Sequence, residues 1–118
     1  MPKVIVDGQD LVVGLSWLEK LGAFRGNVHV PLRAVRSAEP EPDPWGALRG
    51  IRAPGTGIPG VIAYGTRRYD GGRDFAAVLG SRPAIRVDLG EESPFGRLVV
   101  SVSDPDRTVA AIRSAAGI

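Results

Sequence analysis

Glycine and proline recur along the whole chain and constrain its fold more than any other feature. The 118 residues include 16 glycines and 10 prolines, which separate short apolar runs throughout the sequence. Such regular breaks leave little room for long helices and are typical of a small β-rich domain. We therefore expect a mainly β chain that folds as one domain over residues 1–118.

The apolar runs between these breaks alternate as half-buried strands do. In "AIRVDL", Ile85, Val87 and Leu89 share one face, and the charged side chains between them share the other. The Asp-Gly pairs at 7–8 and 70–71 favour tight hairpin turns. We expect strands over 3–6, 10–15, 28–33, 61–69, 73–79, 84–89 and 97–103, an extended segment after residue 34 and a short helix at 44–48.

Two segments carry helix signals. Ser16 and Glu19 have the spacing of a capping box, which predicts at least one helical turn within 16–27, although an irregular strand there is nearly as compatible. The chain ends with a clearer helix, because Asp104 can cap it and Gly117 stands where it should stop. Its first residue is Pro105, and its apolar side chains recur at helical spacing: Val109, Ile112 and Ala116.

Strands followed by one terminal amphipathic helix favour a small antiparallel barrel or two nearly orthogonal sheets, with the helix covering one open end. Three stretches, "VPLRAVRSAEPEPDPWGALRGIRAPGTGIPGVIAYGT", "GGRDFAAV" and "LVVSVSDPDRTVAAI", are similar to a group of small uncharacterised bacterial proteins with a pleckstrin-homology-like (PH-like) fold. The resemblance implies an antiparallel barrel of six or seven strands capped by the C-terminal helix. It implies no particular activity.

The stretch "PGTGIPG" has the glycine spacing of a dinucleotide-binding fingerprint, with Gly55, Gly57 and Gly60. That fingerprint needs a strand before its first glycine and a helix at its third, because the helix N-terminus binds the pyrophosphate. Here "VIAYGT" follows Gly60 and is typical of a strand, and Pro59 removes an amide. We therefore interpret the motif as a stiff connector that leads into the central hairpin.

The connector opens the basic part of the chain. Residues 49–86 carry seven basic and two acidic residues, whereas the whole chain has a net charge of +2. A candidate anion site combines free amides in the connector with nearby arginines; the alternative is that the arginines of the hairpin pair with Asp70 and Asp74. The candidate residues are Arg49, Arg52, Gly55, Thr56, Gly57, Arg67, Arg68 and Arg73.

Other classes of function find little support. The chain has no cysteine and one histidine, His29, so we expect no disulfide, no metal site and no catalytic triad. We expect no bound cofactor. Arginine and aromatic residues interleave only in "YGTRRY", which is too little for a nucleic-acid platform. The absence of a long apolar run predicts a cytoplasmic protein without stable membrane association.

These observations favour a non-enzymatic interaction module that associates with itself or with another protein. The candidate surfaces are the strand "VHVPLR" and three outward apolar positions, Ala76, Val78 and Val99. Trp17, Phe24 and Trp45 are expected to close the ends of the barrel. The alternative is a barrel that binds a small anionic molecule at the loop between Arg49 and Gly60.

Overall fold

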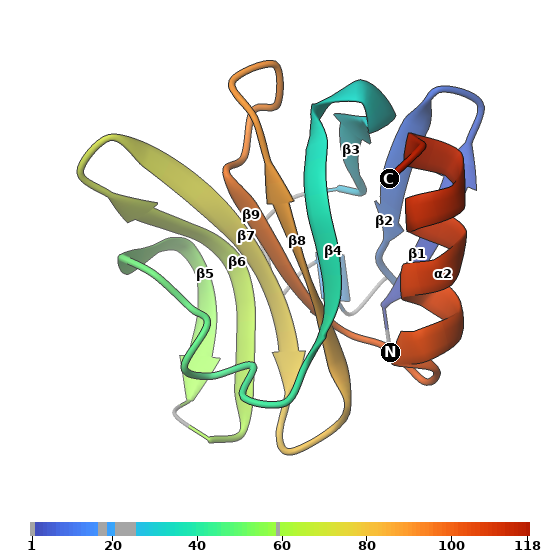
Figure 1. Ribbon diagram of the computed structural model, residues 1–118. Helices are drawn as coiled ribbons and strands as arrows, with labels where there is room; N and C mark the ends of the chain where they lie inside the picture. The colour runs from blue at the N-terminus through green and yellow to red at the C-terminus, as the bar shows by residue number, and fades with distance from the viewer. Residues whose placement is uncertain (1, 17–18, 21–25, 59) are drawn as a thin grey trace.

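Two β-sheets and a C-terminal helix form the part of the chain described by the computed structural model, namely residues 2–16, 19–20, 26–58 and 60–118 (Figure 1). One sheet has the strand order β1-β2-β3, and the other has the order β4-β8-β9-β7-β6-β5. The elements are β1 (Lys3–Asp7), β2 (Asp10–Gly14), β3 (Val28–Pro31), the 3-10 turn η1 (Leu32–Ala34), β4 (Val35–Glu41), β5 (Ile51–Ile58), β6 (Ile62–Tyr69), β7 (Gly72–Leu79), β8 (Ala84–Leu89), β9 (Arg97–Ser101) and α2 (Pro105–Ala116). The mainly β class with a terminal helix is confirmed.

The two hairpin turns and the terminal helix form where their local signals predict them. Gly8 and Gly71 take positive φ angles of 62° and 96° in the turns that join β1 to β2 and β6 to β7. Asp104 accepts a hydrogen bond from the Arg107 amide at 3.2 Å and caps α2. Gly117 ends the helix in the left-handed conformation, with a φ of 74°.

The capping box near residue 16 is also formed. The Ser16 amide donates to Glu19 Oε1 at 2.7 Å, and the Glu19 amide donates to Ser16 Oγ at 3.3 Å. Most of the rest of the segment that follows, with Trp17 and Phe24, lies outside the described residues. Residues 44–47 form turns rather than the short helix that the sequence suggested.

The number and direction of the strands differ from expectation. The described residues form nine strands rather than six or seven, and β7 pairs with β9 in parallel. The expectation of a wholly antiparallel arrangement is therefore wrong at this pair. The strand order β8-β9-β7 explains the parallel pair. After β7, the chain forms β8 one position further along the sheet and in the opposite direction. It then reverses again, so that β9 lies between β8 and β7, antiparallel to β8 and parallel to β7.

The largest correction concerns the glycine motif, because its residues up to Ile58 belong to the edge strand β5 and not to a connector. Its residues pair with β6 in register, for example Gly55 with Gly65 and Thr56 with Tyr64. The register shifts between Arg52 and Gly55, so that Pro54 lies at a bulge, where its missing amide interrupts no regular pairing. Low intrinsic strand propensity is tolerated here because β5 lies at the edge of the sheet.

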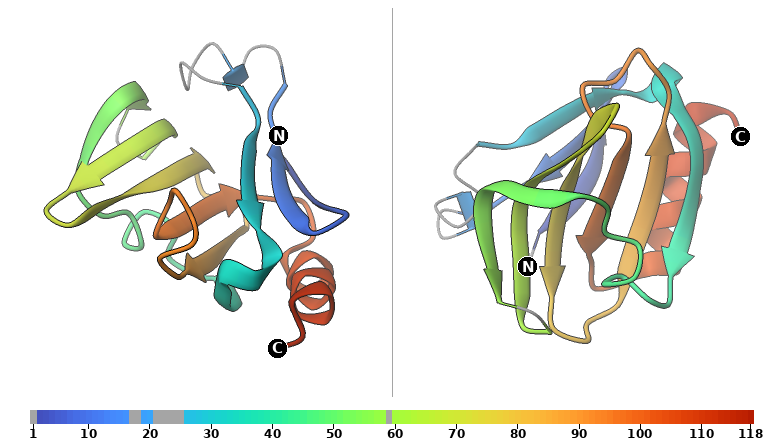
Figure 2. Two further views of the ribbon diagram at one scale, coloured as in Figure 1. Left: turned by 90° about the horizontal axis from the view of Figure 1, so that it is seen from above. Right: turned by 90° about the vertical axis from the view of Figure 1, so that its left-hand side faces the viewer.

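The main core lies between the two sheets and against α2. It includes Leu11 and Val30 of the small sheet, Phe75 and Ile85 of the large sheet, and Ile112 of the helix. Figure 1 shows α2 beside β1 and β4, and Figure 2 shows β5 at the opposite side of the large sheet. The helix thus packs against an edge strand of each sheet, β1 of the small sheet and β4 of the large one.

A second, smaller apolar cluster covers the other face of the large sheet. Ala63, Val78 and Val99 are buried there with Ala47, under the half-buried side chains of Trp45 and Leu48. Trp45 Nε1 also donates to the Gly80 carbonyl at 2.8 Å. Trp45 therefore covers a sheet face rather than the end of a barrel.

The burial of this face corrects one of the predicted self-association surfaces. Strand alternation placed Ala76, Val78 and Val99 on the outward face, but each side chain is at most 1% exposed. The loop between β4 and β5 covers this face, so these residues are not available to a second molecule without displacing it.

Candidate functional site

The predicted site residues lie around one end of the β6–β7 hairpin and along β5. Arg67 and Arg68 belong to β6, Arg73 belongs to β7, and Arg49 precedes β5. The backbone of Gly55, Thr56 and Gly57 runs along β6 as part of an antiparallel ladder. A ladder directs successive amides to opposite sides, so these amides do not converge on one anion as a nest requires. The side chain of Arg52 lies outside the described residues.

Arg49 is committed to a buried partner. Its Nε and Nη2 atoms donate to Asp74 Oδ2 and Oδ1 at 2.7 Å and 2.8 Å, and Nη2 also donates to Tyr69 Oη at 3.1 Å. The guanidinium also lies over the Tyr69 ring, 4.7 Å from its centroid. The hydrogen bonds with Asp74 raise the pKa of Arg49 above the usual value of an arginine. These contacts tie the segment before β5 to the hairpin.

Arg67 binds backbone rather than a carboxylate. Its Nε donates to the Arg49 carbonyl at 3.2 Å, and its Nη2 donates to the Gly50 carbonyl at 2.9 Å. Both bonds hold the chain as it enters β5. Asp74 is thus the partner of Arg49, and the expected pairing of Asp74 with the hairpin's own arginines is not observed.

The remaining two predicted arginines, Arg68 and Arg73, line a groove of about 660 Å³ together with Arg36 of β4. We call this the arginine groove. It lies between the β6–β7 hairpin and the loop that joins β8 to β9, and it also contains Glu91. Four glycines contribute to its lining: Gly71, Gly72, Gly90 and Gly96. Glycine leaves the backbone accessible, so a ligand in the groove could reach peptide groups as well as guanidiniums.

The three arginines differ in how far they are already engaged. Arg73 donates from Nε to the Pro94 carbonyl at 2.9 Å and lies over the Phe95 ring, 5.0 Å from its centroid. Within the described part of the chain, the side chains of Arg36 and Arg68 make no hydrogen bond or ion pair. Arg36 packs closely on Gly90, where an added Cβ atom would come within 2.8 Å of Arg36 Nε. Two guanidiniums therefore have all their donors available to a ligand.

Arg36 was not found from the sequence, and its position depends on a local irregularity. The register of β4 against β8 shifts between Val35 and Ser37, which leaves Arg36 as the extra residue of a bulge. A bulge turns a side chain away from the regular alternation of a strand. The only sequence signal is the arginine itself, because both the bulge and the approach of Gly90 depend on pairing with β8.

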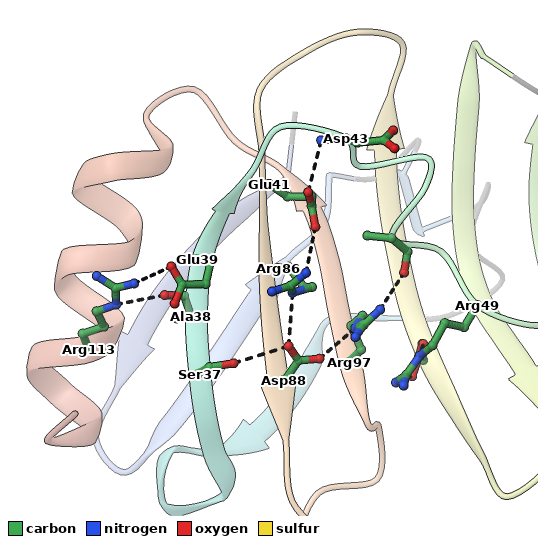
Figure 3. A network of polar contacts seen from close by, with 12 residues as sticks. Ser37, Ala38, Glu39, Glu41, Asp43, Arg49, Arg86, Asp88, Arg97 and Arg113 are labelled. Atoms are coloured by element: carbon green, nitrogen blue, oxygen red, sulfur yellow. Dashed lines mark hydrogen bonds and ion pairs between the residues drawn. The ribbon is translucent and has the colours of Figure 1, made fainter.

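Other charged groups on the large sheet balance one another. Arg86 pairs with Glu41 and Asp88, each at 3.1 Å, and Arg97 pairs with Asp88 at 2.7 Å (Figure 3). Ser37 also donates to Asp88, at 3.3 Å. Two arginines and two carboxylates balance each other's charge in this network, so it offers a ligand no net charge. The buried Arg86 Nε makes no hydrogen bond despite its ion pair with Asp88.

His29 is exposed on β3, and the described residues contain no group of three or more histidine or carboxylate side chains that could hold a metal ion. In that same portion of the chain, no helix combines the length and apolar character needed to cross a bilayer.

Comparison with known proteins finds no relative of this chain. No family model, curated protein or solved structure matches the chain.

Proposed function

We propose that this protein is a non-enzymatic binding module that holds an anionic group in the arginine groove. The observation that carries the proposal is the meeting of Arg36, Arg68 and Arg73, from three different strands, on one open groove. Glu91 is the one acidic side chain among its lining residues, so the groove has an excess of positive charge. This excess would attract an anion, and two of the cations need give up no partner to bind it.

The chemistry of arginine supports phosphate or carboxylate as the bound group. A guanidinium presents several N–H donors in a planar fork that matches two oxygens of such an anion. It also stays protonated near neutral pH, so it can bind and orient an anion but cannot accept a proton as a general base. A groove built on arginines is therefore suited to binding rather than to acid–base catalysis.

We also propose that the domain belongs to the PH-like class. The sequence resemblance, the mainly β architecture and the terminal helix packed against β1 and β4 support this assignment. The parallel β7–β9 pair is a local departure from a simple antiparallel meander. The proposed anion site does not depend on the class, because it rests on the side chains of the groove alone.

Calorimetric titration with inorganic pyrophosphate at low ionic strength tests the proposal, with citrate as a carboxylate probe. We expect saturable binding of at least one probe, weakened about tenfold or more by Arg36→Ala and by Arg68→Ala, since each removes charge-assisted hydrogen bonds. Added salt should weaken binding in the wild type.

Arg33→Ala is the matched control, because Arg33 is also exposed but lies on η1 outside the groove. It should weaken binding much less than the groove variants do, because it removes a charge near the groove but no hydrogen bond to the anion. The proposal fails if neither probe binds at millimolar concentration. It also fails if Arg33→Ala weakens binding as much as the groove variants do, because binding would then reflect net charge alone.

A further inference from the structure

Strand β1 is an unpaired edge of the small sheet and carries exposed apolar side chains. Its neighbour on one side is β2, and no strand of the described chain lies on its other side. Ile5 is 52% exposed and Val6 is 40% exposed, and both are among the most exposed large apolar residues of the molecule. Free edges with apolar side chains tend to pair with another strand.

The backbone phase of β1 leaves two residues ready for such pairing. Asp7 pairs with Asp10 across the two-residue turn, and a turn of this kind is closed by a backbone hydrogen bond between the two flanking residues. Hydrogen-bonded and non-hydrogen-bonded pairs then alternate along the ladder. The amide and carbonyl of Val4 and Val6 accordingly face away from β2, towards the open edge.

The sequence of β1 complements itself when it is read in the opposite direction. The strand is Lys3-Val4-Ile5-Val6-Asp7, with a cation at one end, an anion at the other and β-branched residues between. Lys3, Ile5 and Asp7 share one face, and all three are exposed. A two-fold axis through Ile5 would set each Lys3 opposite Asp7 of the second copy.

We propose that two copies of this chain associate through antiparallel pairing of β1 with β1 about that axis. The pairing joins two three-stranded sheets into one of six strands. Val4 of each copy forms a hydrogen-bonded pair with Val6 of the other, which uses all four outward-facing residues. Ile5 meets its own equivalent on the exposed face, between the two Lys3–Asp7 ion pairs.

Charge and backbone phase select this partner and this register. Parallel pairing would place Lys3 beside Lys3 and Asp7 beside Asp7, which is repulsive. Moving the axis by one residue still pairs outward-facing backbone groups with each other, but it no longer sets Lys3 opposite Asp7 of the second copy. An isologous contact of this type closes as a dimer instead of growing into a filament.

The other edge of the small sheet is less suited to pairing. β3 ends at Pro31, which has no amide to donate, and His29 is the one exposed side chain among its four residues. Its alternating sequence also predicts a surface for self-association. The exposed side chains favour β1 instead.

Charge reversal combined with sedimentation equilibrium tests the pairing. The wild type should sediment at twice its mass of 12.4 kDa at about 100 μM, within the range of weak specific association. Lys3→Glu and Asp7→Lys should each weaken self-association about tenfold at low salt, because two-fold symmetry turns two attractive pairs into two repulsive ones.

Mixing the two single variants provides the sharpest readout. In a mixed dimer, Glu at position 3 faces Lys at position 7, and the native Lys3 faces the native Asp7, so both pairs are attractive. The mixture and the double variant should therefore recover nearly the wild-type association. All three variants should keep the wild-type circular dichroism spectrum, and they should keep its melting temperature at concentrations where every protein is monomeric.

Several outcomes would overturn the proposal. A wild type that is monomeric at 100 μM excludes the dimer, and association that is unchanged in both single variants excludes this register. Recovery in neither the mixture nor the double variant shows that the charges act independently of each other. Arg36→Ala lies on the other sheet and should not alter association, so the dimer and the arginine groove can fail separately.

Discussion

Arg49 and Asp74 form a two-pronged ion pair that joins the segment before β5 to strand β7, 25 residues later in the chain. Asp74 is only 3% exposed, whereas the Arg49 side chain is 39% exposed. Tyr69 Oη donates a further hydrogen bond to Asp74 Oδ1 at 3.0 Å. The buried carboxylate therefore depends on groups from the hairpin and from the chain leading into β5.

Arg49→Ala should destabilise the fold because it leaves Asp74 buried with one fewer charged partner. We expect a loss of about 2 kcal/mol, less than the 3–5 kcal/mol typical of breaking a fully buried pair, since Arg49 is partly exposed. Urea denaturation provides the measurement. Arg107→Ala is the control, because its exposed ion pair with Asp104 should contribute under about 0.5 kcal/mol. Equal losses in the two variants would show that the Arg49–Asp74 pair is not structural.

Two glycines with the same backbone angle provide a second prediction. Gly50 and Gly60 both have a φ of 76°, but an added Cβ at Gly50 would overlap the Arg68 carbonyl, whereas at Gly60 it would meet nothing within 4 Å. Gly60→Ala should cost only the left-handed strain, about 1 kcal/mol. Gly50→Ala should cost about 2 kcal/mol more, since overpacking adds to the strain. Thermal and urea unfolding compare the two, and similar losses would contradict the close approach of Gly50 to β6.

Trp45 should matter because it covers an apolar sheet face. Trp45→Ala should cost about 2 kcal/mol, below the usual 3–5 kcal/mol, since the ring is only half-buried. It should also increase the fluorescence of a hydrophobic dye, because the Val78 and Val99 face becomes accessible. Trp45→Phe keeps apolar cover and loses the bond to Gly80, so its loss should be nearer 1 kcal/mol. Equal losses of stability in Trp45→Ala and Trp45→Phe would mean that the hydrogen bond to Gly80, and not the apolar cover, provides the stabilisation.

Elements with local signals were predictable, and those that depend on distant pairing were not. The hairpin turn at Gly8, the Asp104 cap and the end of α2 at Gly117 all form as expected, because a few neighbouring residues determine each of them. β8 spans 84–89 as the alternation predicts. β5 was missed because glycine and proline disfavour strands, and only its pairing with β6 makes one.

The same division applies to the candidate site. Arg68 and Arg73 were identified together because they flank one hairpin turn, a local relationship. Arg36 joins them only through the pairing of β4 with β8 and the bulge at that pair. Arg49 was counted as a possible ligand because its partner Asp74 lies on a different strand, and sequence alone does not reveal which carboxylate is buried. The distribution of charge along the sequence therefore predicted the basic region, but not which of its arginines lack a carboxylate partner.

The two tyrosines of the chain are expected to resist ionisation in the folded state. Burial and the neighbouring Glu19 carboxylate raise the pKa of Tyr64 well above its usual value near 10, and Tyr64 Oη donates to Glu19 Oε2 at 3.0 Å. Burial and Asp74 also raise the pKa of Tyr69. Absorbance titration at 295 nm of Tyr64→Phe and Tyr69→Phe reports each remaining tyrosine separately. Ionisation of native Tyr64 near pH 10 would contradict its burial.

The raised pKa of Tyr64 also predicts how stability changes with pH. The unfolded chain releases the Tyr64 proton near pH 10 while the folded chain keeps it, so this contribution to stability is complete below pH 10 and declines above it. Tyr64→Phe should be less stable than the wild type by about 1 kcal/mol at pH 7, because Glu19 loses a donor. The difference should shrink by about 1 kcal/mol between pH 9 and pH 11, since only the wild type has this proton to lose. Urea denaturation at each pH measures both stabilities, and a difference that stays constant across this range would show that Tyr64 titrates alike in the folded and unfolded chains.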